Sequence, residues 1–142
     1  AKYLQINKNL IPTGKFKNIK KSIYDFSNFE NIGKKLDYFK NKKFNNKFKG
    51  FDITFSLKKN LKNYVGTLKN NNTKIQVDFF SNLPGLQLYS AQNLNYKKKL
   101  FPYQGICLET QYFPDAPNKK NFPSTLIKPN KRYTCFTKIK IS

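Results

Sequence analysis

The sequence of 142 residues has no histidine, only two cysteines and a single arginine. Ordinary zinc sites draw their ligands from cysteine and histidine, so two cysteines without histidine exclude such a site. The chain also lacks any apolar run that approaches the roughly 20 residues of a membrane-spanning helix. We therefore expect a protein that holds no metal ion and does not enter a membrane.

Its two cysteines, Cys107 and Cys135, lie far apart in the sequence and can pair only if the fold brings them together. Residues 1–16 mix lysine and asparagine with isolated apolar residues, which is unlike the apolar core of a secretory signal. Disulfide-stabilised proteins are mainly secreted, and neither the two cysteines nor the first 16 residues have the pattern of a secreted protein. We expect a cytoplasmic protein.

The net charge of +21, together with 14 phenylalanines and nine tyrosines, is typical of a nucleic-acid-binding domain. Recognition of phosphates and bases, however, favours the planar fork of arginine, and Arg132 is the single arginine. The lysines are scattered over the whole length, as on a solvated surface. We expect no specific nucleic-acid partner, and a basic single-strand-binding β-domain stays as an alternative that predicts steeply salt-dependent binding.

Apolar residues recur at a spacing of two between short clusters of asparagine, glycine and proline, which predicts an all-β fold. Asn70, Asn71 and Asn72 favour a hairpin turn because asparagine tolerates positive φ. Residues 31–39 form the one short helix that we expect, and residues 40–49 and 96–99 are polar enough for mobile loops. The predicted strands are residues 2–6, 50–57, 63–68, 74–80, 86–89, 105–111 and 132–141.

Three of these strands carry polar groups on the face opposite their large apolar side chains. Alternation places Asp52 on that face in FDITFSL (residues 51–57), Gln87 in LQLY (residues 86–89) and Glu109 in GICLETQ (residues 105–111). If the strands share a sheet, the face offers carboxylates, an amide and a phenol, which suit a neutral sugar; phosphate would favour arginine or a glycine-rich loop. The alternative is that each polar face is simply the wet side of an antiparallel sheet.

Glu109 is one of only two glutamates among 28 basic residues, and it lies within an apolar strand. As a general base in a ligand cleft, it would have to be held rigidly and partly desolvated so that its proton affinity rises. As an ordinary strand residue, it would simply be solvated. The residue type and its position leave both interpretations open.

Four segments match the motifs of one family in the same order. LETQYFPDAPNKKNFPST (residues 108–125) contains LETQ, FPDA and FP at the spacing of a long C-terminal signature, and AKYLQINKNLIPTG (residues 1–14) ends in LIPTG. Two shorter motifs lie between these segments. One is DF followed by IG, in IYDFSNFENIGKKL (residues 23–36), and the other is PG followed by Q, in NLPGLQLYSAQNL (residues 82–94). The sequence closely resembles the aldose 1-epimerases, the galactose mutarotases, over nearly its whole length.

The resemblance implies a large antiparallel β-sandwich of the galactose mutarotase type, of which residues 1–142 form the C-terminal part of a single domain. The N-terminal portion would then be a necessary partner. In the family it carries the acid histidine, upstream of the segment that residues 1–14 resemble, and this chain has no histidine. We therefore expect the 142 residues to be inactive by themselves.

The resemblance also assigns roles to the three residues of the shared face. Glu109 matches the family's general base, and Asp52 and Gln87 match side chains that contact the sugar. Ile53 departs from the pattern, because the family usually has histidine after the aspartate. Ala91 and Gln92 replace a Gly-Asn pair at the rim of the cleft.

The implied activity is the interconversion of the α and β anomers of an aldohexose, galactose or glucose, by general acid–base catalysis without a cofactor. Glu109 would take the proton of the anomeric hydroxyl while an acid protonates the ring oxygen. The ring opens, the C1–C2 bond rotates and the ring closes again. The alternative within this resemblance is a non-catalytic carbohydrate-binding protein or a relative that resembles sugar-phosphate epimerases.

Overall fold

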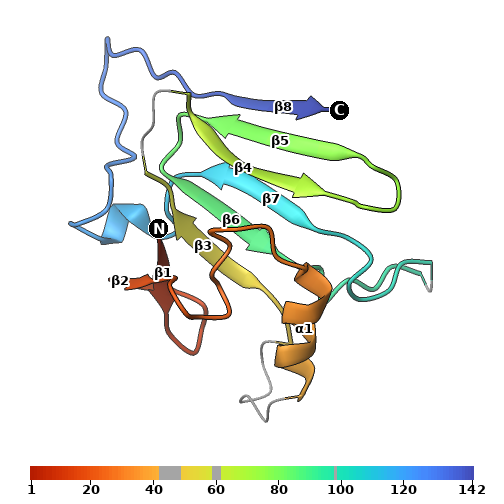
Figure 1. Cartoon of the computed structure of the whole chain (residues 1–142). Helices are drawn as coiled ribbons and strands as arrows, with labels where there is room; N and C mark the ends of the chain where they lie inside the picture. Colours follow the sequence, from red (N-terminus) through yellow and green to blue (C-terminus); the bar gives the residue numbers. More distant parts are fainter. Residues whose placement is uncertain (42–48, 59–61, 98) are drawn as a thin grey trace.

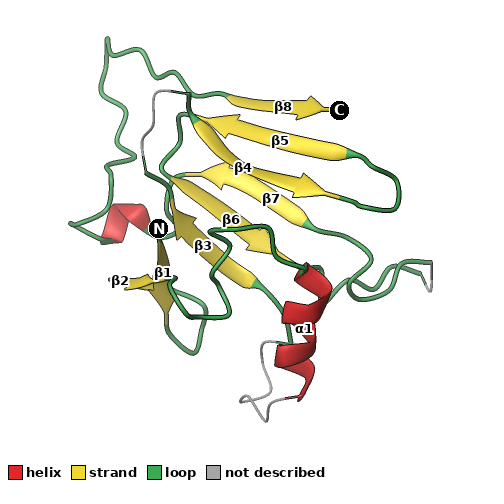
Figure 2. Ribbon diagram, viewed as in Figure 1, coloured by secondary structure: helices red, strands yellow, loops and turns green. Residues whose placement is uncertain are grey.

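The computed structural model describes residues 1–41, 49–58, 62–97 and 99–142, so most of the expected loop at residues 40–49, and Lys98 in the loop at residues 96–99, lie outside the described residues. The described part is built mainly of β-strands, with one α-helix and a single turn of 3-10 helix (Figures 1 and 2). The elements are β1 (Lys2–Ile6), β2 (Pro12–Asn18), α1 (Ile32–Asn41), β3 (Asp52–Ser56), β4 (Tyr64–Lys69), β5 (Gln76–Ser81), β6 (Gly85–Tyr89), β7 (Cys107–Gln111), η1 (Ala116–Asn118) and β8 (Thr137–Ile141).

Each predicted strand and the predicted helix is present, β1 with the predicted bounds and the others with shifted ends. The sequence did not predict β2, because Pro12, Gly14 and four polar residues interrupt its pattern. This strand lies at the edge of its sheet, where proline as the first residue costs no ladder hydrogen bond. The last strand begins five residues later than expected, at Thr137 rather than Arg132. The helix begins after Asn31, whose Oδ1 accepts a hydrogen bond of 2.9 Å from the backbone N–H of Lys34.

The strands form two antiparallel sheets. Sheet A has five strands in the order β2-β1-β3-β6-β7, and sheet B has three in the order β4-β5-β8. The asparagine-rich turn joins β4 to β5, as the sequence predicted. Figure 2 shows both sheets in yellow, with β8 on the outside of sheet B.

One face of sheet A is apolar and packs against α1 and the segment that precedes it (Figure 1). At its centre Phe51 is fully buried, with the rings of Phe26 and Phe39 at 5.5 and 5.1 Å from its own. Burying each large apolar side chain contributes about 1.5–3 kcal/mol. The buried residues of this core are Phe39, Phe51, Ile53 and Leu88, and the partly buried side chains around them include Ile23, Tyr24, Phe26, Ile32 and Leu36.

Sheet B turns its apolar face toward this same core. A cavity of about 380 Å³ lies between them, lined by Leu86 and Leu108 of sheet A and by Leu68 and Phe79 of sheet B. The two sheets are therefore the layers of a β-sandwich, and the polar face of sheet A is turned away from the interior.

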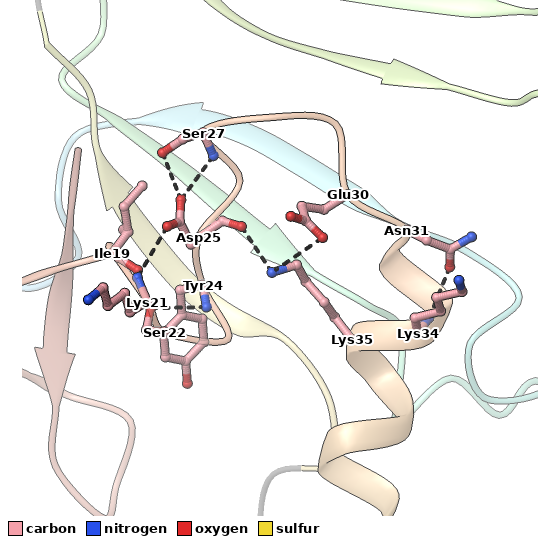
Figure 3. Close-up of polar contacts among 10 residues, drawn as sticks. All are labelled: Ile19, Lys21, Ser22, Tyr24, Asp25, Ser27, Glu30, Asn31, Lys34 and Lys35. Carbon is pink, nitrogen blue, oxygen red and sulfur yellow. Dashed lines mark hydrogen bonds and ion pairs between the residues drawn. The ribbon is translucent and has the colours of Figure 1, made fainter.

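The covering segment is held by polar contacts around Asp25 (Figure 3). Its carboxylate accepts hydrogen bonds from the hydroxyl and the backbone N–H of Ser27 and from the backbone N–H of Lys21. The hydrogen bonds from Ser27 chiefly hold the pKa of Asp25 below its ordinary value, and the nearby charge of Lys35 acts in the same direction. Lys35 also donates to the carbonyl of Asp25 at 2.9 Å and lies 3.9 Å from Glu30. These contacts join α1 to the aromatic residues that cover sheet A.

Candidate functional site

The polar face of sheet A is a grid of nine positions on three adjacent strands. Cross-strand pairing places Thr54 beside Gln87, and Gln87 beside Glu109, in its middle row. Directly paired residues of antiparallel strands lie on the same face, so the register confirms the predicted shared face of Asp52, Gln87 and Glu109. The three rows are Asp52, Tyr89 and Cys107; Thr54, Gln87 and Glu109; and Ser56, Gly85 and Gln111.

A chain of hydrogen bonds fixes the middle of this grid. The Nε2 of Gln87 donates to Oδ1 of Asp52 at 2.6 Å, and the hydroxyl of Thr54 donates to Oε1 of Gln87. An ionised carboxylate only accepts hydrogen bonds, so the carboxamide of Gln87 has one orientation that satisfies both neighbours. Asp52 and Gln87 thus form a rigid polar floor.

Partial burial raises the pKa of Asp52 above its ordinary value, and the hydrogen bond from Gln87 offsets part of that rise. A carboxyl whose pKa is higher in the folded state destabilises the fold when it is ionised. The penalty is absent when the pH is below the pKa of Asp52 in the unfolded state, and it is complete when the pH is above the pKa in the folded state.

We predict that Asp52→Asn, which keeps an oxygen that can accept from Gln87, gains stability relative to the wild type as the pH rises from 3 to 7. Chemical denaturation of both proteins at several pH values measures the difference. A difference that is constant with pH, or that shrinks as the pH rises, would contradict the sign of the Asp52 shift.

Glu109 lies at the outer side of the grid, on the edge strand of sheet A. Its side chain is exposed, so the partial desolvation expected of a general base is not present in this chain by itself. The reason is structural, because within the described ranges β7 pairs with β6 alone and no segment covers its polar face at Glu109. The strand nevertheless fixes the face on which the carboxylate lies. Glu109 is two residues after Cys107 and two residues before Gln111, so the three side chains share one face of β7.

The first row of the grid ends in a phenol and a thiol. Tyr89 lies between Asp52 and Cys107, and its hydroxyl accepts a hydrogen bond of 3.2 Å from the backbone N–H of Asn93. This contact joins the aromatic ring to the loop that follows β6, so the phenol flanks the polar floor. Cys107 is exposed and, like Cys135, is a free thiol.

An aromatic cluster closes the opposite end of the polar face. Phe113 follows β7 and is only 5% exposed, with the rings of Phe16 and Phe122 at 5.7 and 5.0 Å from its own. Leu4 and Ala116 complete this second core. The segment after Glu109, which belongs to the family signature, is therefore structural here, since it forms a wall beside the polar face.

Asp115 shapes the turn between the two phenylalanines of this segment. Its backbone adopts the left-handed conformation with a φ of 59°, which aspartate tolerates better than most residues. Its carboxylate lies 2.8 Å from Nζ of Lys119 and accepts a hydrogen bond of 2.5 Å from Asn118. The hydrogen bonds from Lys119 and Asn118, in that order, lower the pKa of Asp115. This carboxylate is thus engaged in the turn.

Gly85 makes room for Phe113. A Cβ at this position would lie 3.0 Å from Cδ1 of Phe113 and 3.1 Å from the carbonyl oxygen of Gln111. We predict that Gly85→Ala displaces the phenylalanine ring and destabilises the fold by about 1–3 kcal/mol. Gly66→Ala in β4 is the matched control, because a Cβ there meets no atom within 4 Å among the described residues. Equal urea midpoints for the two variants would contradict this account of Gly85.

Sequence reasoning missed the role of Thr54 in the site. Its side chain is only 4% exposed although it lies on the polar face, and its hydroxyl is bonded to Gln87. Alternation did place Thr54 on the correct face. The hydrogen bond depends on the pairing of β3 with β6, which the pattern of either strand alone does not contain.

Comparison with known proteins agrees with the geometry. A family model described as aldose 1-epimerase matches residues 1–140. The chain belongs to the aldose 1-epimerase family. It is 30% identical to the galactose mutarotase of Homo sapiens over 147 residues, which cover 99% of this chain and 41% of that protein. It is 30% identical to the aldose 1-epimerase of Escherichia coli over 100 residues, which cover 64% of this chain and 29% of that protein.

A solved epimerase structure has the same fold. The GalM/aldose epimerase homologue from C. elegans superposes with a TM-score of 0.82 at 18% identity, over 99% of this chain and 43% of that one. These results confirm the family resemblance and the all-β, sandwich-type fold. The chain spans about two-fifths of the length of these epimerases. Among the residues with described positions, the helices are too short or too polar to cross a membrane.

Proposed function

We propose that this chain supplies the sugar-binding floor and the general base of an aldose 1-epimerase that interconverts the α and β anomers of an aldohexose, galactose or glucose. The observation that carries the proposal is the shared face of Asp52, Gln87 and Glu109, with Gln87 bonded to Asp52. A carboxylate and a carboxamide side by side offer both acceptors and donors to adjacent sugar hydroxyls.

In this proposal Glu109 takes the proton of the anomeric hydroxyl, and an acid protonates the ring oxygen as the C1–O bond breaks. The open-chain aldehyde rotates about C1–C2, and reclosure reverses both proton transfers. Asp52 and Gln87 hold hydroxyls on the far side of the sugar, so that the anomeric oxygen lies over β7. Each positioned acid or base typically contributes about 10² to 10⁴-fold to the rate.

The acid belongs, in this proposal, to the N-terminal portion of the epimerase, which acts as the partner of residues 1–142. Two features of sheet edges support a place for that portion beside Glu109. Strand β7 has a free edge within the described part of the chain. Ile139 and Ile141 of β8 lie on the side of sheet B that faces the interior, yet they are 56% and 71% exposed. Strands of the partner that extend both sheets would bury these isoleucines and desolvate Glu109.

Polarimetry of freshly dissolved α-galactose tests the proposal. We expect the 142 residues alone to leave the rate of mutarotation unchanged, and the same chain fused behind the N-terminal portion of an epimerase to accelerate it. Catalysis by the 142 residues alone would show that a group within this chain serves as the acid. Galactose binding by the fusion without turnover would instead favour a non-catalytic carbohydrate-binding protein.

A further inference from the structure

Thr54 is the most buried polar side chain of the grid, and the pairing of β1 with β3 puts it on the same face as Leu4 of the second core. It lies in the central row of the polar face, between the exposed edge at Glu109 and the second core, and is 4% exposed. A buried hydroxyl costs free energy unless it is hydrogen-bonded, and the partner of Thr54 is Oε1 of Gln87. The hydroxyl therefore acts on the carboxamide of Gln87.

Gln87 connects Asp52 and Thr54 through the two ends of its carboxamide. Its Nε2 donates to Asp52 at 2.6 Å, while its Oε1 accepts from Thr54. Glutamine is a flexible side chain that loses rotamer entropy when it is fixed in one conformation. Hydrogen bonds at both ends of the carboxamide offset this cost. Loss of the bond from Thr54 would leave the carboxamide held at one end alone.

Resting on the function proposed above, we infer that Thr54 is a positioning residue of the sugar site, which fixes the carboxamide of Gln87 so that Asp52 and Gln87 face the ligand as one unit. With Oε1 held by Thr54 and one N–H held by Asp52, the second N–H of Gln87 is left for a sugar hydroxyl. Asp52 keeps its other oxygen as an acceptor. Thr54 itself is too buried to touch the sugar.

The test uses Thr54→Val, which has the same shape without the hydroxyl, and Thr54→Ser, which keeps the hydroxyl. The side-chain carboxyl of Asp52 is titrated by ¹³C NMR in the 142-residue chain, and the side-chain amide signals of Gln87 are recorded in the same samples. In T54V the carboxamide loses its second anchor and donates less to Asp52, so the Asp52 midpoint rises by about half a pH unit. The T54S variant titrates like the wild type.

Asp78 of β5 is the internal control, because its own partners are Thr67 and Gln76 on sheet B and its titration should not move. A general loss of packing would shift Asp78 too and would not be rescued by serine. A T54V variant with the wild-type Asp52 midpoint and unmoved Gln87 signals overturns the positioning role, even if the fusion protein catalyses mutarotation. A shifted midpoint that serine restores supports it, even if no turnover is found.

Discussion

Glu109→Gln is expected to lower the rate of mutarotation by about 10² to 10⁴-fold in the fusion protein, with little change in the affinity for galactose. The carboxamide has the shape of the carboxylate but cannot take the anomeric proton. Because the side chain is exposed in this chain, the substitution should change the stability of the 142 residues by less than about 0.5 kcal/mol. Polarimetry and chemical denaturation measure the two effects separately.

Glu30→Gln is the matched control, since Glu30 is the other glutamate of the chain. It lies before α1 and near Lys35, in the segment that covers the opposite face of sheet A. Its substitution should leave the rate unchanged. Full activity in E109Q, or an equal loss in E30Q, would remove Glu109 from the proposed mechanism.

Phe113→Ala is expected to cost about 3–5 kcal/mol of unfolding free energy, the range found when a buried aromatic side chain is removed. The ring is 5% exposed and packs against two other phenylalanines and Leu4. A loss of this size is a large fraction of the stability of a small protein. Urea denaturation followed by circular dichroism measures it.

Phe29→Ala is the control for this prediction, because the Phe29 side chain is 74% exposed. Its removal should change stability by less than about 0.5 kcal/mol. If the two substitutions had similar effects, the second core would not be the structural wall described here. The FPDA segment would then require a different explanation.

Local patterns predicted the faces of the strands well. Alternation needs only the chain itself, so Asp52, Gln87 and Glu109 could be assigned to polar faces from the sequence. That the faces coincide depends on the order β3-β6-β7, which is a property of the whole sheet. Alternation suggested a shared cleft if the strands lie in one sheet, and the motif resemblance independently pointed to the same three side chains.

Other features depend on contacts that a pattern does not contain. Strand β2 was missed because Pro12 and Gly14 interrupt the alternation of apolar residues, and its pairing with β1 makes it a strand. Thr54 read as one of several polar residues until the register brought its hydroxyl to Gln87. The sequence left Glu109 open between a desolvated base and a solvated strand residue, because its exposure depends on what lies beyond the edge of β7.

The most direct test of the central claim is a crystal structure of the fusion protein with galactose bound. We predict that the anomeric oxygen lies within hydrogen-bonding reach of the Glu109 carboxylate, about 2.6–3.2 Å. Two further hydroxyls should contact Asp52 and Gln87. Galactose bound in the apolar cavity between the sheets, or on the polar face with its anomeric carbon turned away from β7, would contradict the proposed site.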